Sequence, residues 1–276
     1  MSFSQNFIKS STLVKQLLDI TSIDNNDLVV EIGPGRGIIT QELIRLAKEV
    51  IVIEKDRTLI QSLRTKFDHQ TNLKIFNQDF LTWSLPSTSF KIFSNIPFDI
   101  TAKIVDKLLK SKNKASEIYF IMQLEAADKY LIGNDLNTQN SILLSIFYDA
   151  EILGDIDRTA FTPKPQVDIV FTKFTLLPNP LIDPRLYPQF RDFVIFGFNQ
   201  WKSNMFEIYK KIFSYDQFKK INHQLKINDL KPSQLNIDQW LKLFDIYQKF
   251  VSQNKKDLID GFEKTYIKKI RTKNYY

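Results

Sequence analysis

Glycines cluster at one point of the chain where a tight turn could hold a ligand. Gly33, Gly35 and Gly37 lie within five residues, although the whole chain has only seven glycines. They directly follow the apolar run 28–31 and precede a helical pattern that begins at Ile38. Glycine permits positive φ and a close approach of the backbone, and the start of a helix offers unpaired N–H groups. The cluster predicts a ligand-binding turn; a tight strand-to-helix connection without a ligand is the alternative.

Carboxylates stand where three predicted strands end. Glu31 ends the first run, Glu54 ends the run 50–54, and Asp79 follows the run 74–76. A carboxylate at the end of the second strand can accept both ribose hydroxyls of a bound nucleoside, which serves NAD and S-adenosylmethionine alike. Asp79 could accept a hydrogen bond from an adenine amino group. Each acid read singly is more often a surface charge, but together they predict one cofactor-binding edge.

The tetrapeptide Asn95-Ile96-Pro97-Phe98 favours S-adenosylmethionine over NAD as the cofactor. It resembles the motif of methyltransferases that act on exocyclic amines. An adenine N6 lone pair is delocalised into the ring, so the amine needs acceptors that draw its hydrogens away. The Asn95 side-chain oxygen and the Ile96 carbonyl could be those acceptors, with Pro97 fixing the turn and Phe98 stacking on the base. An ordinary Asn-x-Pro turn with a buried Phe is the alternative.

Short apolar runs must position these residues. Five runs rich in β-branched and aromatic residues alternate with helical patterns, and such runs fit strands buried on both faces of a parallel sheet. The alternation predicts a mostly parallel, doubly wound α/β fold, in which ligands bind beyond the carboxyl ends of the strands. The runs are 28–31, 50–54, 74–76, 91–95 and 118–123, and further strands are expected around 154–157 and 167–174.

Prolines mark a boundary between two predicted domains. Residues 177–184 contain three prolines and break the periodicity, so we expect a cofactor-binding catalytic domain over 1–176 and a linker over 177–184. Apolar residues then recur at helical spacing, and Asn236 with Gln239 forms a capping-box pattern. We therefore expect a small, all-helical RNA-binding domain over 185–251, followed by a basic tail over 252–276 that frays.

Composition excludes several classes of site. The chain has no cysteine and only two histidines, which argues against disulfides, thiolate zinc sites and any metal cofactor. No apolar run approaches the roughly 18 residues that span a bilayer, and no signal peptide is evident. We expect a cytoplasmic monomer that does not contact membranes.

The net positive charge of the chain lies in its C-terminal third. Residues 177–276 hold 18 Lys and Arg against 10 Asp and Glu, whereas residues 1–176 hold 20 against 21. A basic lobe beside a near-neutral one indicates a phosphate-backbone partner, because neutralised phosphates release condensed counterions. Solvated lysines of a Lys-rich proteome are the alternative.

Five motifs in order resemble the rRNA adenine N6-methyltransferase family. They are Ser4-Gln5-Asn6-Phe7, Glu31-Ile32-Gly33-Pro34-Gly35-Arg36-Gly37, Asp79, Asn95-Ile96-Pro97-Phe98 and Phe161-Thr162-Pro163-Lys164-Pro165. The resemblance covers about residues 3–251 and implies a Rossmann-like class I methyltransferase fold. Within the family, the C-terminal pattern resembles the Erm type more than the KsgA/Dim1 type. A KsgA/Dim1 enzyme would show an Arg-Arg-Lys cluster near 198–206, where this chain reads FNQWKSNMF.

The resemblance implies transfer of one or two methyl groups from S-adenosylmethionine to N6 of one adenine in the peptidyl-transferase region of 23S rRNA, which gives macrolide, lincosamide and streptogramin B resistance. The target must leave its stack before it reacts. The residues assigned to the cofactor are Gln5, Asn6, Glu31, Gly33, Gly35, Glu54, Lys55, Asp79, Phe80 and Asn95. The residues assigned to the target adenine are Asn95, Ile96, Pro97, Phe98 and Phe161.

Each assigned residue has an expected role. Gln5 and Asn6 close over the cofactor, Gly33 and Gly35 approach its methionine part, and Glu54 takes the ribose. Asp79 and Phe80 hold its adenine. Lys55 stands where the family usually has an aliphatic residue, and its stem would substitute. Phe161 is expected on the second face of the flipped base.

Three other functions remain open from the sequence. A KsgA/Dim1-type dimethyltransferase would act on the small-subunit rRNA. A non-catalytic RNA-binding factor could use the same fold, although the presence of Glu54, Asp79 and the tetrapeptide 95–98 argues against it. A dehydrogenase would gain nothing from that tetrapeptide.

Overall fold

The protein consists of two units. A computed structural model describes residues 6–133 and 136–273. The first unit comprises the chain up to Asp128 together with Tyr148–Leu177, and the second comprises Lys129–Phe147 and the chain from Pro178 onward. Residues 129–147 thus group with the C-terminal helices, whereas the predicted boundaries placed them in the domain over 1–176.

A seven-stranded sheet forms the centre of the first unit, in the order β4-β3-β2-β5-β6-β9-β7. The first five strands in this order are parallel; beyond them β9 pairs antiparallel with β6, and β7 pairs antiparallel with β9. The strands are β2 (Leu28–Ile32), β3 (Glu49–Glu54), β4 (Leu73–Asn77), β5 (Lys91–Asn95), β6 (Glu117–Gln123), β7 (Tyr148–Ile156) and β9 (Ile169–Leu176). A separate antiparallel pair joins β1 (Phe7–Ile8) to β8 (Phe161–Thr162). The predicted mostly parallel sheet is confirmed.

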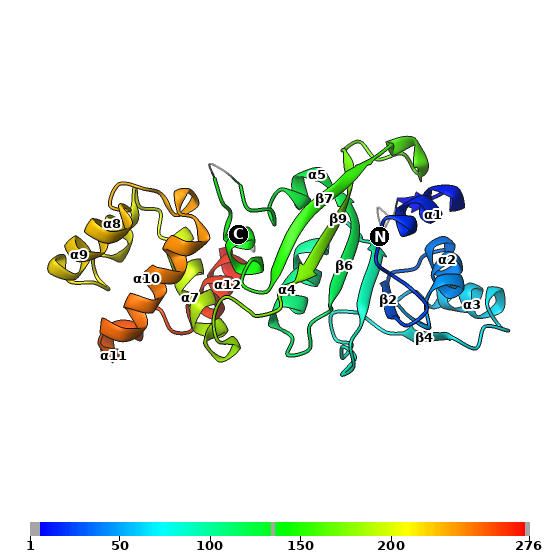
Figure 1. Ribbon diagram of the computed structural model, residues 1–276, viewed down its shortest axis with the longest axis horizontal. Helices are drawn as coiled ribbons and strands as arrows, with labels where there is room; N and C mark the ends of the chain where they lie inside the picture. Colours follow the sequence, from blue (N-terminus) through cyan, green and yellow to red (C-terminus); the bar gives the residue numbers. More distant parts are fainter. Residues whose placement is uncertain (1–5, 134–135, 274–276) are drawn as a thin grey trace. The chain divides into compact units, whose positions relative to one another are not determined.

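Helices cover both faces of this sheet. The helices of the first unit are α1 (Ser11–Asp19), α2 (Ile38–Leu46), α3 (Arg57–Lys66), α4 (Thr101–Lys110) and the short α5 (Leu124–Ala127). From β2 the chain moves outward through β3 and β4 in one direction, and β5 and β6 lie in the other. Right-handed crossovers therefore place α2 and α3 on one face and α4 on the opposite face. In Figure 1, α1, α2 and α3 (blue) lie together and α4 lies away from them.

The central strands are buried, as the continuous apolar runs indicated. Val29, Val50 and Ile92 have no exposed surface, since helices pack on both faces of a parallel sheet. The rings of Phe93 and Phe171 lie 5.5 Å apart between centroids and extend this core toward the antiparallel edge.

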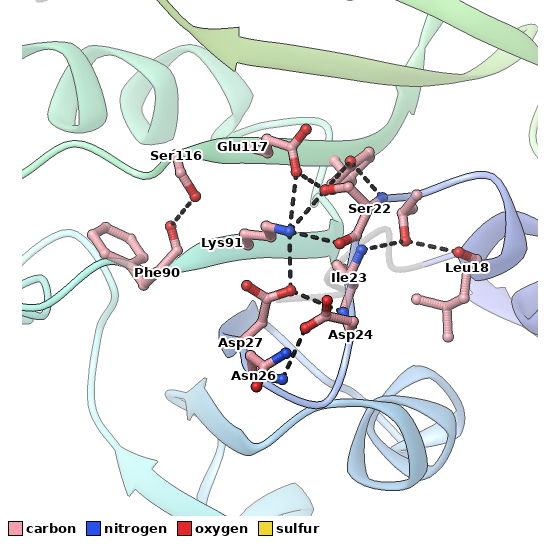
Figure 2. A network of polar contacts seen from close by, with 12 residues as sticks. Leu18, Ser22, Ile23, Asp24, Asn26, Asp27, Phe90, Lys91, Ser116 and Glu117 are labelled. Atoms are coloured by element: carbon pink, nitrogen blue, oxygen red, sulfur yellow. Dashed lines mark hydrogen bonds and ion pairs between the residues drawn. The ribbon is translucent and has the colours of Figure 1, made fainter. Parts of the chain in front are cut away.

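A polar network ties the amino ends of the strands together (Figure 2). The ammonium of Lys91, at the start of β5, lies 2.9 Å from Asp27 and 3.3 Å from Glu117 and donates to the backbone oxygen of Ser22 at 2.7 Å. Lys173 lies 3.0 Å from Glu117. Burial alone would lower the pKa of Lys91, but the hydrogen bonds and charges of the two carboxylates outweigh it and raise that pKa. The network joins the segment after α1 to β5 and β6.

Helices build the second unit around α7. They are α6 (Gln139–Leu144), α7 (Tyr187–Phe198), α8 (Met205–Tyr209), α9 (Tyr215–Leu225), α10 (Ile237–Phe250), α11 (Gln253–Lys256) and α12 (Phe262–Lys273), with 3₁₀ turns at Pro184–Leu186 and Pro232–Gln234. The predicted capping box of α10 is present, because Asn236 Oδ1 accepts from the Gln239 N–H and Gln239 Oε1 accepts from the Asn236 N–H. A Cβ on Gly197 would lie 2.7 Å from Trp240 and Tyr209, so α7 packs tightly here.

Residues 129–147 join this unit through α7. The Tyr187 hydroxyl donates to the Leu143 carbonyl at 3.3 Å, and the rings of Phe147 and Tyr187 lie 4.6 Å apart. The Asn137 side chain donates to the Leu235 carbonyl at 3.1 Å. These contacts connect positions far apart in the sequence, which is why local patterns did not reveal them.

Within residues 253–273, where the sequence predicted a fraying tail, the structure has the helices α11 and α12. Asp192 of α7 accepts hydrogen bonds from the backbone N–H groups of Gly261 and Glu263, both at 2.8 Å. Buried Arg191 pairs with Glu263 at 2.6 Å. Anchored acidic and basic partners on α7 therefore hold α12 in place. In residues 6–133 and 136–273, we find no helix with the length and apolar character needed to cross a membrane.

We expect Lys91→Met to lower the free energy of unfolding by about 2 kcal/mol, because Asp27 and Glu117 would lose the cation that compensates them. Lys74→Met is the matched control, since Lys74 pairs with Glu49 at a strand start but is 61% exposed. The control should cost less than about 0.5 kcal/mol. Urea denaturation of both variants measures this, and equal losses would contradict the role given to the Lys91 network.

Candidate active site

The turn after β2 uses glycine because side chains do not fit. Gly33, Gly35 and Gly37 have φ of +65°, +55° and +73°, a region that L-residues with a Cβ disfavour. A Cβ on Gly35 would lie 2.8 Å from the Phe7 ring, and one on Gly37 would lie 2.7 Å from Leu63. The Gly33 N–H donates to the Ile53 carbonyl at 2.9 Å, which fixes the turn against β3.

A first hollow opens between this turn and the end of β5. Its lining residues come from β1, from the glycine turn and from the segment after β5: Asn6, Phe7, Ile8, Gly33, Pro34, Gly35, Arg36, Ile38, Ile39, Asn95, Ile96, Pro97 and Phe98. The Asn95 side-chain nitrogen donates to the Asn6 carbonyl at 2.8 Å. This bond orients the Asn95 amide and joins two motifs that lie 89 positions apart in the chain.

The segment from Asn95 to Phe98 is held rigidly by its neighbours. The hydroxyl of buried Ser94 donates to the Ile32 carbonyl at 2.5 Å, and the Ile96 N–H donates to the Ile121 carbonyl at 3.0 Å. The Ile100 N–H donates to the Pro97 carbonyl at 3.2 Å. Within the described part of the chain, no donor bonds to Asn95 Oδ1 or to the Ile96 carbonyl oxygen. Both oxygens are thus acceptors beside the hollow.

A second hollow continues from the first at Gly33 and Pro97, which line both. Its lining residues are Ile32, Gly33, Ile53, Glu54, Lys55, Gln78, Asp79, Phe80, Leu81, Pro97, Asp99 and Ile100. The strand ends of β3 and β4 therefore meet in this hollow, as expected for parallel strands.

Glu54 is the buried carboxylate of the second hollow. It is 3% exposed; Oε1 accepts from the Asp56 N–H at 2.9 Å. Its other oxygen, Oε2, is buried and has no hydrogen-bond partner among the described residues. Burial raises the pKa of Glu54, although backbone N–H groups of Asp56, Lys55 and Gly35 act to lower it. A buried acceptor without a donor fits a ligand hydroxyl.

Phe80 and Asp79 form the far end of this hollow. Asp79 is exposed; its Oδ1 accepts from the Leu81 N–H at 2.8 Å. Lys107 of α4 donates to the carbonyls of Phe80 and Trp83, and its ammonium lies 4.5 Å from the centre of the Phe80 ring. Burial lowers the pKa of Lys107, against the charge of Asp79. Lys107 thus fixes the loop, and no local sequence signal indicated this role.

The structure does not bring every predicted residue to the hollows. Glu31 is 1% exposed and lines neither hollow; its Oε2 accepts from the Thr40 hydroxyl at 2.6 Å beneath α2. Phe161 is 1% exposed and packs in the core beside Ile8, because β8 pairs with β1. Gln5 lies outside the described residues.

Arg36 was not predicted, although it stands inside the glycine turn. It lines the first hollow, and its guanidinium lies 5.2 Å from the centre of the Phe7 ring. Lys66 donates to the Arg36 carbonyl at 3.3 Å and supports the turn from α3. The second hollow is lined by Glu54, whose Oε2 has no partner among the described residues, and the first is lined by Asn95 and Ile96, whose two oxygens could accept from an amine. This arrangement suits a nucleoside cofactor beside a second planar amine.

Comparison with known proteins points to one family. The sequence profile described as "Ribosomal RNA adenine dimethylase" matches residues 1–249. The "Ribosomal RNA small subunit methyltransferase A" of Acaryochloris marina is 30% identical over 260 residues, covering 88% of this chain and 95% of that protein. An "rRNA adenine N-6-methyltransferase" of Lysinibacillus sphaericus is 31% identical over 248 residues, covering 90% and 96%. The crystal structure of the 23S rRNA methyltransferase ErmE has a TM-score of 0.75 at 24% identity, covering 88% and 100%, and shows the fold.

The burial of Glu31 should make the stability of the protein depend on pH. Burial raises the pKa of Glu31 to about 8, against the hydrogen bond from Thr40 that lowers it. The folded protein therefore holds a proton that the unfolded chain releases near pH 4.5, and stability falls as pH rises between these values. We expect Glu31→Gln to remove this loss, so that its stability relative to the wild type rises by up to roughly 1.4 kcal/mol per pH unit between pH 5 and 8.

Urea denaturation at pH 5, 6.5 and 8 measures the difference. Glu42→Gln serves as a control because Glu42 is also buried but pairs with Arg45 at 3.0 Å. Parallel pH profiles for Glu31→Gln and the wild type would refute the proton on Glu31.

Proposed function

Since the chain belongs to the ribosomal RNA adenine dimethylase family, we propose that it methylates one adenine in the peptidyl-transferase region of 23S rRNA. Members of the family are rRNA adenine N6-methyltransferases that use S-adenosylmethionine. The enzyme class and the cofactor follow from this membership. The target adenine, the residues that act on it and the resulting macrolide resistance are the proposal.

Glu54 is proposed to bind the ribose of the cofactor. The observation that supports this role is that Glu54 lines the second hollow and that its buried Oε2 has no hydrogen-bond partner among the described residues, as a carboxylate awaiting a ribose hydroxyl would. Asp79 and Phe80, in the same hollow, would hold the adenine, with Lys55 beside them. Gly33 and Gly35 line the first hollow, and without side chains their backbone would be open to the methionine part.

Asn95 and Ile96 are proposed to activate the target amine. S-adenosylmethionine supplies an electrophilic methyl group on a sulfonium sulfur. Asn95 Oδ1 and the Ile96 carbonyl would accept the two N6 hydrogens, which pulls the lone pair of the nitrogen out of conjugation with the ring. Phe98, which lines the first hollow, would stack on the base. After attack the nitrogen loses a proton, and the donor leaves as a neutral thioether.

The observation that carries the choice of 23S rRNA is the sequence of the second unit. Residues 198–206 read FNQWKSNMF, without the Arg-Arg-Lys cluster expected of the small-subunit enzymes. The patterns around Tyr209 and in α10 resemble the Erm type as well. A relative named for the small subunit and one named only as an rRNA adenine N-6-methyltransferase match the chain at 30% and 31% identity, so the choice rests on these residues of the second unit.

A small-subunit target is the second candidate, because a relative named for the small subunit covers 88% of the chain. Primer extension on rRNA from a host that expresses the protein separates the two. We expect a new stop in domain V of 23S rRNA, together with resistance to macrolides, lincosamides and streptogramin B. The inactive Asn95→Ala protein is the control. A modification confined to 16S rRNA would reject the proposed target.

We expect Asn95→Ala to lower methyl transfer by about 100-fold or more, because the amine loses one of its two acceptors. Affinity for S-adenosylmethionine should change less than about 3-fold, since Glu54 carries the ribose contact. Glu54→Gln should have the contrasting effect: its affinity for the cofactor should fall by about 10-fold or more. Transfer of labelled methyl groups to rRNA and calorimetric titration of the cofactor measure both. Unchanged turnover in Asn95→Ala would remove the role of Asn95.

A further inference from the structure

Trp201 stands out in the second unit because its side chain is 94% exposed. The other two tryptophans of the chain, Trp83 and Trp240, are 8% and 0% exposed. Trp is enriched where proteins contact partners, because its ring combines a large apolar area with a polar N–H group.

The backbone at Trp201 is unfavourable as well. Its φ is +53°, in the left-handed region that bulky side chains disfavour. In the described part of the chain, only one other residue besides glycine, Lys226, has positive φ. Strain of this kind persists where the surrounding structure imposes it and is concentrated at functional sites.

Fixed helix ends hold the loop that carries Trp201. At the end of α7, the Asn199 side chain donates to the Ile195 carbonyl at 2.7 Å and to Gln139 at 2.9 Å. At the start of α8, Asn204 Oδ1 accepts from the Glu207 N–H at 3.0 Å. The Met205 N–H donates to the Leu230 carbonyl at 2.8 Å. The exposed ring is therefore presented on a short loop that is anchored at both ends.

Charge indicates the partner. Trp201 is followed by exposed Lys202 and belongs to the unit that holds the positive charge of the chain. An aromatic ring on a basic surface is the usual arrangement for binding unpaired nucleotides, where bases stack on the ring and lysines approach phosphates.

We propose that Trp201 stacks on an unpaired rRNA base other than the methylated adenine. The proposal rests on the proposed function in that the RNA is the substrate of the enzyme. Because stacking tolerates any base, Trp201 would add to the affinity for RNA and fix the position of the rRNA on the protein. The residues around Asn95 would select the reacting amine. Trp201 is thus a binding residue and has no part in the methyl transfer itself.

Trp201→Gly tests the proposal, since glycine suits the positive φ and the variant should retain the denaturation midpoint of the wild type. We expect the KM for a domain V fragment of 23S rRNA to rise about 10-fold, with kcat and cofactor affinity unchanged. Trp201→Phe keeps a stacking ring and should stay within about 3-fold of the wild type. Lys202→Gln is the contrasting variant: it should reduce the salt dependence of RNA binding by about one charge, whereas Trp201→Gly should not.

Fluorescence gives a readout that is independent of catalysis. Acrylamide should quench Trp201 in the free protein, and saturating RNA should protect it; the difference between wild type and Trp201→Phe isolates this signal from Trp83. The titration is repeated with a 3′-terminal fragment of 16S rRNA. Protection by that fragment with methylation of it would reject the 23S target and still support stacking. Protection by neither RNA, or wild-type RNA binding by Trp201→Gly, would overturn the proposal. Loss of self-association alone in that variant would assign the ring to a contact between copies and also overturn it.

Discussion

The site of the first unit depends on a carboxylate that the fold buries without satisfying it completely. Glu54 ends β3 with one oxygen bonded to the Asp56 N–H and the other without a partner among the described residues. An unsatisfied buried acceptor costs roughly 1–3 kcal/mol, and the sheet that positions it must supply that stability. Because a hydroxyl of a ligand would satisfy the oxygen, the same defect favours binding.

The two edges of the sheet contrast in this respect. At the amino ends of the strands, Lys91 forms ion pairs with the carboxylates of Asp27 and Glu117, so both charges are compensated (Figure 2). At the carboxyl ends of the strands, Asn95 and Ile96 beside the first hollow and Glu54 beside the second keep acceptor oxygens that no described donor satisfies. A parallel sheet brings all its carboxyl ends to one edge, so unsatisfied groups can be collected there while the rest of the unit is packed and paired.

Local patterns predicted the elements better than the direction of individual side chains. The apolar runs and the glycine cluster indicated the strands and the turn because burial on both faces and positive φ leave direct marks on the sequence. Glu31 and Glu54 have similar positions in the sequence, near the ends of successive strands. Glu31 accepts a hydrogen bond from Thr40 of α2, however, whereas Glu54 lines a hollow. Phe161 is buried through its pairing with β1. Contacts over long sequence separations decide such cases, and they also bring residues 129–147 and α12 onto α7.

Under the proposed function, the two units would divide the chemistry and the recognition of the rRNA between them. The hollows, the glycine turn and the acceptors around Asn95 all lie in the first unit, and they suit any adenine that has left its stack. A site of this kind cannot by itself distinguish one rRNA from another, because the same base edge is presented in each. Selection must then come from contacts outside the flipped base. The excess of positive charge and the exposed Trp201 lie in the second unit, so the proposed contacts that select the rRNA would be made there.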